Sequence, residues 1–167
     1  MIKYAVINTK LGWVGIGSSE RGLIFITLPK LSSKEVISQI DILIADKANE
    51  DYLAFGDLPQ RLQRYFNGER VTFPDRLDLS NATAFQRTVW SLTRAIPYGE
   101  TRSYAWVARQ IGRPQALRAV GGALARNRFP IIVPCHRVIA TSGSLGGFSG
   151  GLELKKRLLD LEAKQIS

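Results

Sequence analysis

The single cysteine and the single histidine of the chain are neighbours, in the segment Pro134-Cys135-His136-Arg137. A lone cysteine is most often a small buried hydrophobic residue, and that is the alternative to a chemical role. A basic neighbourhood favours the thiolate, however, and a nearby histidine can accept the thiol proton. The segment is therefore the candidate site of nucleophilic chemistry.

The run Ile131-Ile132-Val133 predicts a buried strand that holds Cys135 rigidly. Adjacent side chains on extended backbone point in opposite directions, so we expect His136 to reach the sulfur through a bridging water. We also expect Arg137 to favour the thiolate by its charge.

A histidine used as a base needs a third group that fixes its tautomer. Glu162 is the candidate, because a helix predicted from Leu152 to Ala163 places it three and four residues after Leu159 and Leu158. This spacing puts the carboxylate on or beside the buried face, where an unpaired charge would be costly. An ordinary surface glutamate at a helix end is the alternative.

The positive charge lies in the second half of the chain. Residues 1–80 carry ten basic and ten acidic residues, whereas residues 81–167 carry thirteen basic and four acidic ones, which accounts for the net charge of +9. Seven arginines and no acid lie between Thr101 and Arg137. Such a field attracts polyanions, and arginine favours bidentate phosphate contacts. General solubility is the alternative explanation.

The elements predict two domains of different class, with a boundary near Ser80-Asn81. Residues 1–80 are expected to form a small β-sheet domain with helices and to serve a structural role, and residues 81–167 a mostly helical domain. The first domain is predicted to contain strands in Lys3 to Asn8 and Val14 to Leu28, helices in Ser33 to Ala45 and Leu58 to Phe66, and an extended segment from Val71 to Leu79.

Two closely spaced helices in the second domain resemble a helix-turn-helix. Ser103 can cap the first helix and Gly112 can close it, while Pro114 suits the first position of the second. Leu117, Val120 and Leu124 are the predicted buried stripe of the second helix, with Arg118 and Arg126 off that stripe. Because many short helix pairs bind nothing, the arginines are what favour DNA binding.

Glycines mark two further places. Gly121 and Gly122 each cost roughly 0.5–1 kcal/mol inside a helix, which indicates either close approach of a nucleic acid or tight packing between helices. The glycine-rich segment 141–151 follows the cysteine and is either a connector or a loop that wraps a flat ligand.

Ile132-Val133-Pro134-Cys135-His136-Arg137-Val138 resembles the active-site signature of the O6-alkylguanine-DNA alkyltransferases. The resemblance extends over most of residues 82–167. It includes Pro97 to Thr101, Ser103-Tyr104, Arg118 to Ala123, Asn127, Ser149 to Leu152 and Glu162. Residues 1–80 are similar to the family's variable N-terminal domain only in size and element order.

The resemblance implies repair of DNA in a single turnover, with an alkyl group moved from O6-alkylguanine, and also from O4-alkylthymine, onto Cys135. His136 would act as the base through a water with Glu162 behind it, and Asn127 would tie the strand to the DNA-binding helix. Tyr104 would hydrogen-bond the extruded guanine, and Arg118 would fill the gap that the base leaves. The implied DNA-binding residues are Arg118, Ala119, Gly121, Gly122, Arg126, Thr101 and Ser103, and the implied pocket residues are Val138, Phe148, Ser149 and Trp90.

Two residues depart from the pattern of some family members. Phe148 stands where some have tyrosine, and Gly147 stands where some have a larger polar residue, so the range of alkyl groups is the property in doubt. No cofactor and no metal are expected, since one cysteine and one histidine cannot supply the usual four zinc ligands.

The resemblance also implies a partner: double-stranded DNA, bound in the minor groove by a monomer that can act cooperatively. Apolar runs such as Leu23 to Ile26 are too short to span a bilayer, and Met1 to Tyr4 lack a signal-peptide pattern, so we expect a cytoplasmic protein without a membrane partner. Two other functions were weighed. A cysteine hydrolase leaves the arginines without a role, and a non-catalytic DNA-binding module leaves Cys135 without one.

Overall fold

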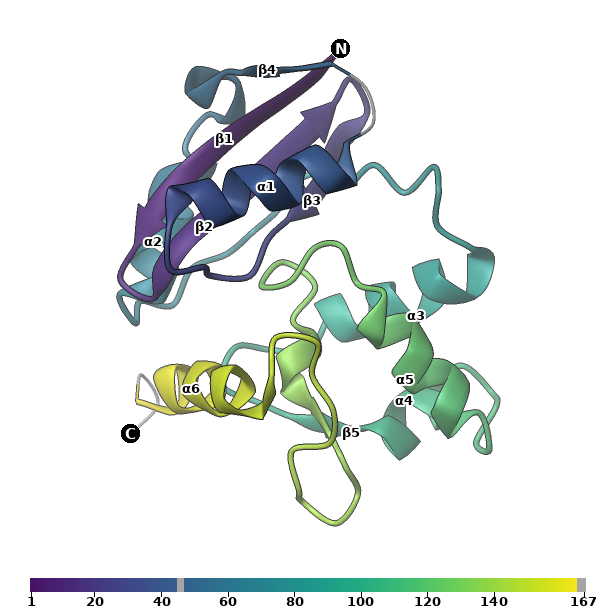
Figure 1. The fold of residues 1–167 in the computed structure, drawn as a ribbon. Coiled ribbons are helices and arrows are strands. Elements are labelled where there is room, and N and C mark those ends of the chain that lie inside the picture. Colours follow the sequence, from purple (N-terminus) through teal and green to yellow (C-terminus); the bar gives the residue numbers. More distant parts are fainter. Residues whose placement is uncertain (45–46, 165–167) are drawn as a thin grey trace. The chain divides into compact units, whose positions relative to one another are not determined.

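The computed structural model describes residues 1–44 and 47–164. The chain divides into two compact units, Met1–Ser80 and Asn81–Ser167. The first is built on a sheet and the second is mostly helical, which confirms the predicted fold class (Figure 1).

The first unit is a four-stranded sheet with a helix on each face. The strands are β1 (Ile2–Thr9), β2 (Gly12–Ser19), β3 (Gly22–Ile26) and β4 (Ala48–Glu50), in the order β3-β2-β1-β4. β1, β2 and β3 are antiparallel neighbours, and β4 runs parallel to β1.

Alternation along β1 explains the two layers, because successive side chains of a strand face opposite sides of the sheet. Val6 packs against the buried cluster that includes Val36 and Ile40 of α1 (Ser33–Leu43), while Ile7 is buried on the opposite face. Figure 1 shows α1 across one face and α2 (Leu58–Phe66) behind the sheet. A short 3₁₀ helix, η1 (Tyr52–Phe55), precedes α2.

The sequence located these elements closely. α2 has the predicted bounds, and α1 ends at Leu43, while the predicted end at Ala45 lies outside the described residues. The segment from Val71 to Leu79 makes one isolated bridge, between Leu77 and Leu23.

The second unit packs helices around the chain segment that carries Cys135. Its helices are α3 (Ala84–Arg94), α4 (Tyr104–Gln110), α5 (Leu117–Ala125) and α6 (Leu152–Ala163). A two-stranded parallel sheet joins β5 (Arg102–Ser103) to β6 (Val138–Ile139). This pairing places the start of α4 beside the segment that follows Cys135.

Capping explains where three helices begin and end. Thr83 and Gln86 form a capping box at α3, and Ser103 Oγ accepts from Trp106 N at 2.9 Å at the start of α4. Gly112, which follows α4, has φ +76°, a conformation that glycine adopts without a steric penalty.

The predicted start of the second helix of the pair is wrong. α5 begins at Leu117, and Pro114 lies in a turn before it, so residues 111–116 separate the helices. The physical reason is that proline fits a turn as well as a first helical position. Leu117 is 45% exposed and is therefore not part of the buried stripe, whereas Val120 and Leu124 are buried.

Among residues 1–44 and 47–164, no helix combines the length and the apolar character that crossing a bilayer requires.

Candidate active site

Cys135 lies on a one-turn 3₁₀ helix, η2 (Cys135–Arg137), not at the end of a strand. Ile131 has φ +77°, which interrupts extended backbone, and Arg137 N donates to Pro134 O at 2.9 Å to form the turn. The predicted strand is wrong because a short buried apolar run has the same sequence pattern whether it is extended or irregular. The alternation argument for His136 therefore does not apply.

Asn127 fixes the approach to Cys135. Its Nδ2 donates to Val133 O at 2.8 Å, and its Oδ1 accepts from Phe129 N at 2.9 Å. Its own backbone N–H donates to Leu124 O at 3.1 Å, so the end of α5 is tied to the segment that leads into η2. The tie to a strand was expected; the tie is to irregular backbone.

Glu162 lies at the centre of a buried ionic cluster. It is 1% exposed, and its Oε2 is 2.6 Å from His136 Nε2. Arg137 donates to both carboxylate oxygens, from Nε at 2.8 Å and from Nη2 at 3.0 Å, and Gly99 N donates to Oε1 at 3.3 Å. A third group behind His136 is therefore present, and the alternative of a surface glutamate is excluded.

The cluster keeps Glu162 ionised and His136 neutral. Burial acts to raise the pKa of Glu162, but the hydrogen bonds and charges of His136 and Arg137 together lower it to about 2. Burial lowers the pKa of His136, against the influence of Glu162. A neutral ring that donates Nε2–H to the carboxylate has its lone pair on Nδ1, which is the form of histidine that can accept a proton.

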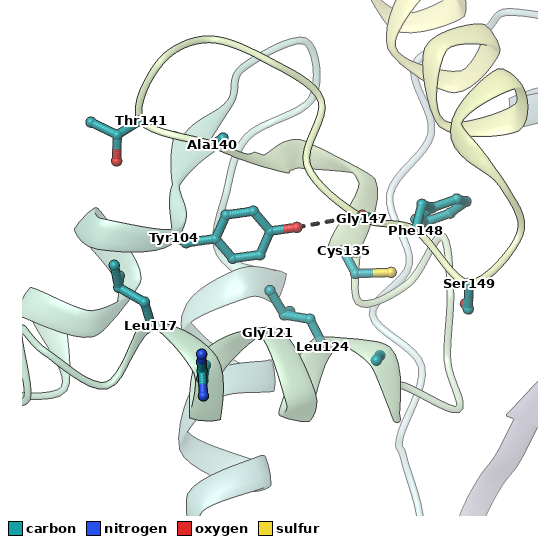
Figure 2. Close-up of a pocket in the computed structure, with 12 residues that line it drawn as sticks. Tyr104, Leu117, Gly121, Leu124, Cys135, Ala140, Thr141, Gly147, Phe148 and Ser149 are labelled. Atoms are coloured by element: carbon teal, nitrogen blue, oxygen red, sulfur yellow. Dashed lines mark hydrogen bonds between the residues drawn. The ribbon is translucent and has the colours of Figure 1, made fainter.

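Cys135 opens onto a cavity of about 640 Å³. The side chain is 9% exposed, and in Figure 2 its sulfur points toward Phe148 and Ser149. Tyr104 reaches into the cavity from α4 and donates from its hydroxyl to Gly147 O at 3.4 Å. The lining residues are Tyr104, Leu117, Arg118, Gly121, Leu124, Ala125, Cys135, Ala140, Thr141, Gly147, Phe148 and Ser149.

Two of the expected pocket residues do not line this cavity. Trp90 is buried, and its indole N–H donates to Ala123 O at 2.8 Å, so its polar edge serves the α3–α5 packing. Val138 is fully buried, and what it offers nearby is its carbonyl, which accepts from Lys155 Nζ at 2.7 Å. Apolar character alone did not distinguish core from cavity wall at either position.

Burial raises the pKa of the Cys135 thiol above its usual value. A hydrogen bond from the Asn127 side chain, the charge of Lys155 and backbone hydrogen bonds act in the opposite direction on this pKa. The thiol is therefore protonated in the substrate-free protein near neutral pH, and a base is needed to make the nucleophile.

Lys155 is the residue that the sequence analysis missed, and Arg137 is the one it misassigned. Arg137 is committed to Glu162 and to Ile96 O, at 2.7 Å, whereas the cation that favours the thiolate is Lys155. A signal was present, because Lys155, Leu158 and Glu162 are the buried residues of α6 and have helical spacing.

The exposed side of α5 borders the cavity. Arg118, Ala119 and Arg126 are exposed, and Arg118 also lines the cavity. A Cβ on Gly121 would meet no atom within 4 Å, and one on Gly122 would meet Arg126 Nη1 at 3.5 Å, so tight packing between helices explains neither glycine. Thr101 is exposed, and Ser103 serves as the cap of α4.

Comparison with known proteins bears directly on this arrangement. Residues 84–164 match the family model of the 6-O-methylguanine DNA methyltransferase DNA-binding domain, and residues 2–79 match that of the family's ribonuclease-like domain. The chain belongs to the 6-O-methylguanine DNA methyltransferase family. The predicted family is confirmed.

Relatives match this methyltransferase-family chain over nearly its whole length. The methylated-DNA–protein-cysteine methyltransferase of Methanosarcina acetivorans is 40% identical over 159 residues, which cover 95% of this chain and 97% of the relative. The crystal structure of Mycobacterium tuberculosis O6-methylguanine methyltransferase has a TM-score of 0.80 at 38% identity, covering 98% of this chain and 94% of the other. The Mycobacterium tuberculosis protein in complex with DNA gives a TM-score of 0.81 at 38% identity and the same coverage.

Metal ligands were not expected in this family member. Within residues 1–44 and 47–164, no group of three or more histidine, cysteine, aspartate or glutamate side chains is placed to hold a metal ion.

Proposed function

We propose that this protein repairs DNA by transferring an alkyl group from O6 of guanine to Sγ of Cys135. The observation that carries the proposal is the placement of Cys135 on the wall of a cavity that Arg118 of the exposed α5 surface also lines. A thiol sealed in the core would have excluded it. Family membership supports the same chemistry, and the relatives named above are methyltransferases that act on methylated DNA.

The reaction is a substitution at the alkyl carbon. His136 Nδ1 accepts the thiol proton through a water, and the imidazolium that forms is stabilised by Glu162 at 2.6 Å from Nε2. The Sγ–C bond forms as the O6–C bond breaks, and the electron pair of that bond leaves on guanine. The proton released by Cys135 balances this charge when guanine takes up a proton.

Tyr104 is the donor placed to assist the leaving base. Burial raises the pKa of Tyr104 above its usual value, so the phenol stays protonated and can donate a hydrogen bond. Its hydroxyl already donates into the cavity, to Gly147 O. On this proposal the bond is exchanged for one to guanine, which makes the guanine anion a better leaving group.

The target base must leave the duplex, because its O6 atom cannot reach a cavity while it is stacked. Arg118 is positioned to enter the stack, and Gly121 leaves open space for close approach by the groove. We assign the minor groove, because side chains that wedge between base pairs usually enter there. The basic residues Arg126 and Thr101's neighbour Arg102 contribute contacts to phosphates that do not depend on sequence.

The thioether has no route back to a thiol, so each molecule acts once, as a monomer and without a cofactor. The test uses an oligonucleotide with a labelled O6-methylguanine. One label per protein molecule is expected, with transfer lost and binding retained in Cys135→Ser. Binding of the lesion without transfer by the unaltered protein would instead identify a non-catalytic DNA-binding module, and repeated turnover would contradict the single-use reaction.

The role of Arg118 has its own test. Arg118→Ala should slow repair of duplex DNA much more than reaction with the free alkylated base, because the free base has no stack to leave. Equal slowing of the two reactions would show that Arg118 does not act by stabilising the extruded base.

A further inference from the structure

Lys155 is a fully buried cation with no carboxylate partner. Its side chain is 0% exposed, at the position of α6 that lies seven residues before Glu162, on the same buried face. Among the described residues, no carboxylate forms an ion pair with its Nζ. An ammonium group in such a place is costly unless something compensates the charge, so its position calls for an explanation.

Neutral groups hold the ammonium in place. Nζ donates to Val138 O at 2.7 Å and to Gly147 O at 3.1 Å. It also lies 5.7 Å from the ring centroid of Tyr104 and 6.0 Å from that of Phe148, within the range of cation–π attraction. These four groups flank the cavity at Cys135, so the ammonium is fixed at the reaction site.

The ionisable groups around Lys155 leave one candidate for its counter-anion. His136 and Cys135 face it from η2 and Tyr104 faces it from α4, while Glu162, on α6 itself, is already paired with His136 and Arg137. Burial lowers the pKa of Lys155 to about 8, and Cys135 is the group that acts to raise this pKa. The two residues interact reciprocally, because Lys155 lowers the pKa of Cys135.

We propose that Lys155 is the positive charge that stabilises the thiolate of Cys135 during alkyl transfer. It acts as a positioning residue, since its ammonium is held by the Val138 and Gly147 carbonyls and influences the sulfur through space. His136 removes the proton, and Lys155 makes the resulting anion less unfavourable in a buried site. The ammonium is thus retained at a position where a neutral side chain would be easier to bury.

The test measures how fast iodoacetamide alkylates Cys135, the single cysteine of the chain, as a function of pH in the full-length protein. Lys155→Met should raise the pH at which the thiolate forms by about one unit, and thus slow alkylation near neutral pH about tenfold. Lys155→Arg keeps the charge and should restore most of the rate. Lys156→Met is the matched control: it removes an exposed lysine that pairs with Asp160 at 2.7 Å, and its profile should equal that of the unaltered protein.

Lys155→Gln separates charge from hydrogen bonding and does not depend on the folding of the methionine variant. Glutamine keeps a donor for one of the two carbonyls, so a purely structural role predicts an unshifted pH profile in this variant. The proposal predicts the same upward shift as in Lys155→Met. An unshifted profile in Lys155→Gln, or an equal shift in Lys155→Gln and Lys155→Arg, would overturn it.

Discussion

Glu162 has two tasks at the scale of single residues, because it orients His136 and also neutralises Arg137. Both partners are buried, and Arg137 is 8% exposed. Removing one member of such a cluster leaves the others with an uncompensated charge, which typically costs about 3–5 kcal/mol. Stability and reactivity should therefore change together at this position.

Glu162→Gln should slow alkylation of Cys135 near neutral pH, because a neutral amide stabilises the imidazolium of His136 less than a carboxylate does. It should also lower the free energy of unfolding by about 3 kcal/mol. Iodoacetamide kinetics and urea denaturation measure the two effects. An unchanged alkylation rate in a folded variant would rule out the role of Glu162 behind His136.

The same carboxylate makes stability depend on pH. Its pKa is lowered from 4.5 to about 2 in the folded protein, so the stabilisation is complete above about pH 4.5 and is lost as the pH falls toward 2. A shift of this size corresponds to about 3 kcal/mol. The difference in unfolding free energy between the unaltered protein and Glu162→Gln should shrink across this interval. A difference that stays constant down to pH 2 would contradict the assignment.

At the scale of elements, Asn127 connects the DNA-facing helix to the reactive cysteine. Its side chain bonds Val133 O and Phe129 N, and it also bonds Cys135. Through these contacts the end of α5 and the start of η2 move as one piece. A displacement of α5 on DNA would therefore be transmitted to the sulfur.

Asn127→Ala should lower the free energy of unfolding by about 1–3 kcal/mol, since it leaves a buried carbonyl and a backbone N–H without these partners. It should also raise the pKa of Cys135, because a donor to the sulfur is lost. Chemical denaturation and the pH profile of thiol alkylation test both parts. Destabilisation with an unshifted profile would limit Asn127 to a structural role.

Gly121 tests whether open space in α5 serves substrate entry. Gly121→Ala should raise the free energy of unfolding by about 0.5–1 kcal/mol, because alanine favours a helix and its Cβ meets no atom within 4 Å. Repair of O6-methylguanine in duplex DNA should nevertheless slow, while alkylation by iodoacetamide stays the same. Repair at the unaltered rate would show that the space is not needed.

At the scale of the whole molecule, charge is divided between the two units of the sequence. Residues 81–167 carry the entire net charge of +9, and residues 1–80 are neutral overall. DNA affinity should therefore depend on salt mainly through the second unit, with log K falling linearly with log salt concentration.

Arg126→Ala should reduce that slope by about one, because each phosphate contact releases about one counterion. Lys10→Ala, which removes an exposed lysine of the first unit, should leave the slope unchanged. Binding titrations at several salt concentrations measure both. Equal slopes for Arg126→Ala and the unaltered protein would remove Arg126 from the phosphate-contacting surface.

The sequence by itself determined the family, the two-domain fold class and the placement of Glu162 on a buried helix face. These features depend on local patterns: the segment around Cys135, the charge shift near residue 80, and helical spacing in α6. Helix periodicity is reliable where a long amphipathic stripe is present, which is why α2 and α6 were found with their bounds.

Tertiary structure alone decided how the reactive groups are held. It replaced the expected strand before Cys135 by irregular backbone, removed Trp90 and Val138 from the cavity wall, and made Lys155 rather than Arg137 the cation at the sulfur. Each of these depends on contacts between segments far apart in the chain, such as Val138 with Lys155 and Arg137 with Glu162. A side chain's type and local spacing show that it is buried, but only its neighbours across the fold determine which charge it compensates.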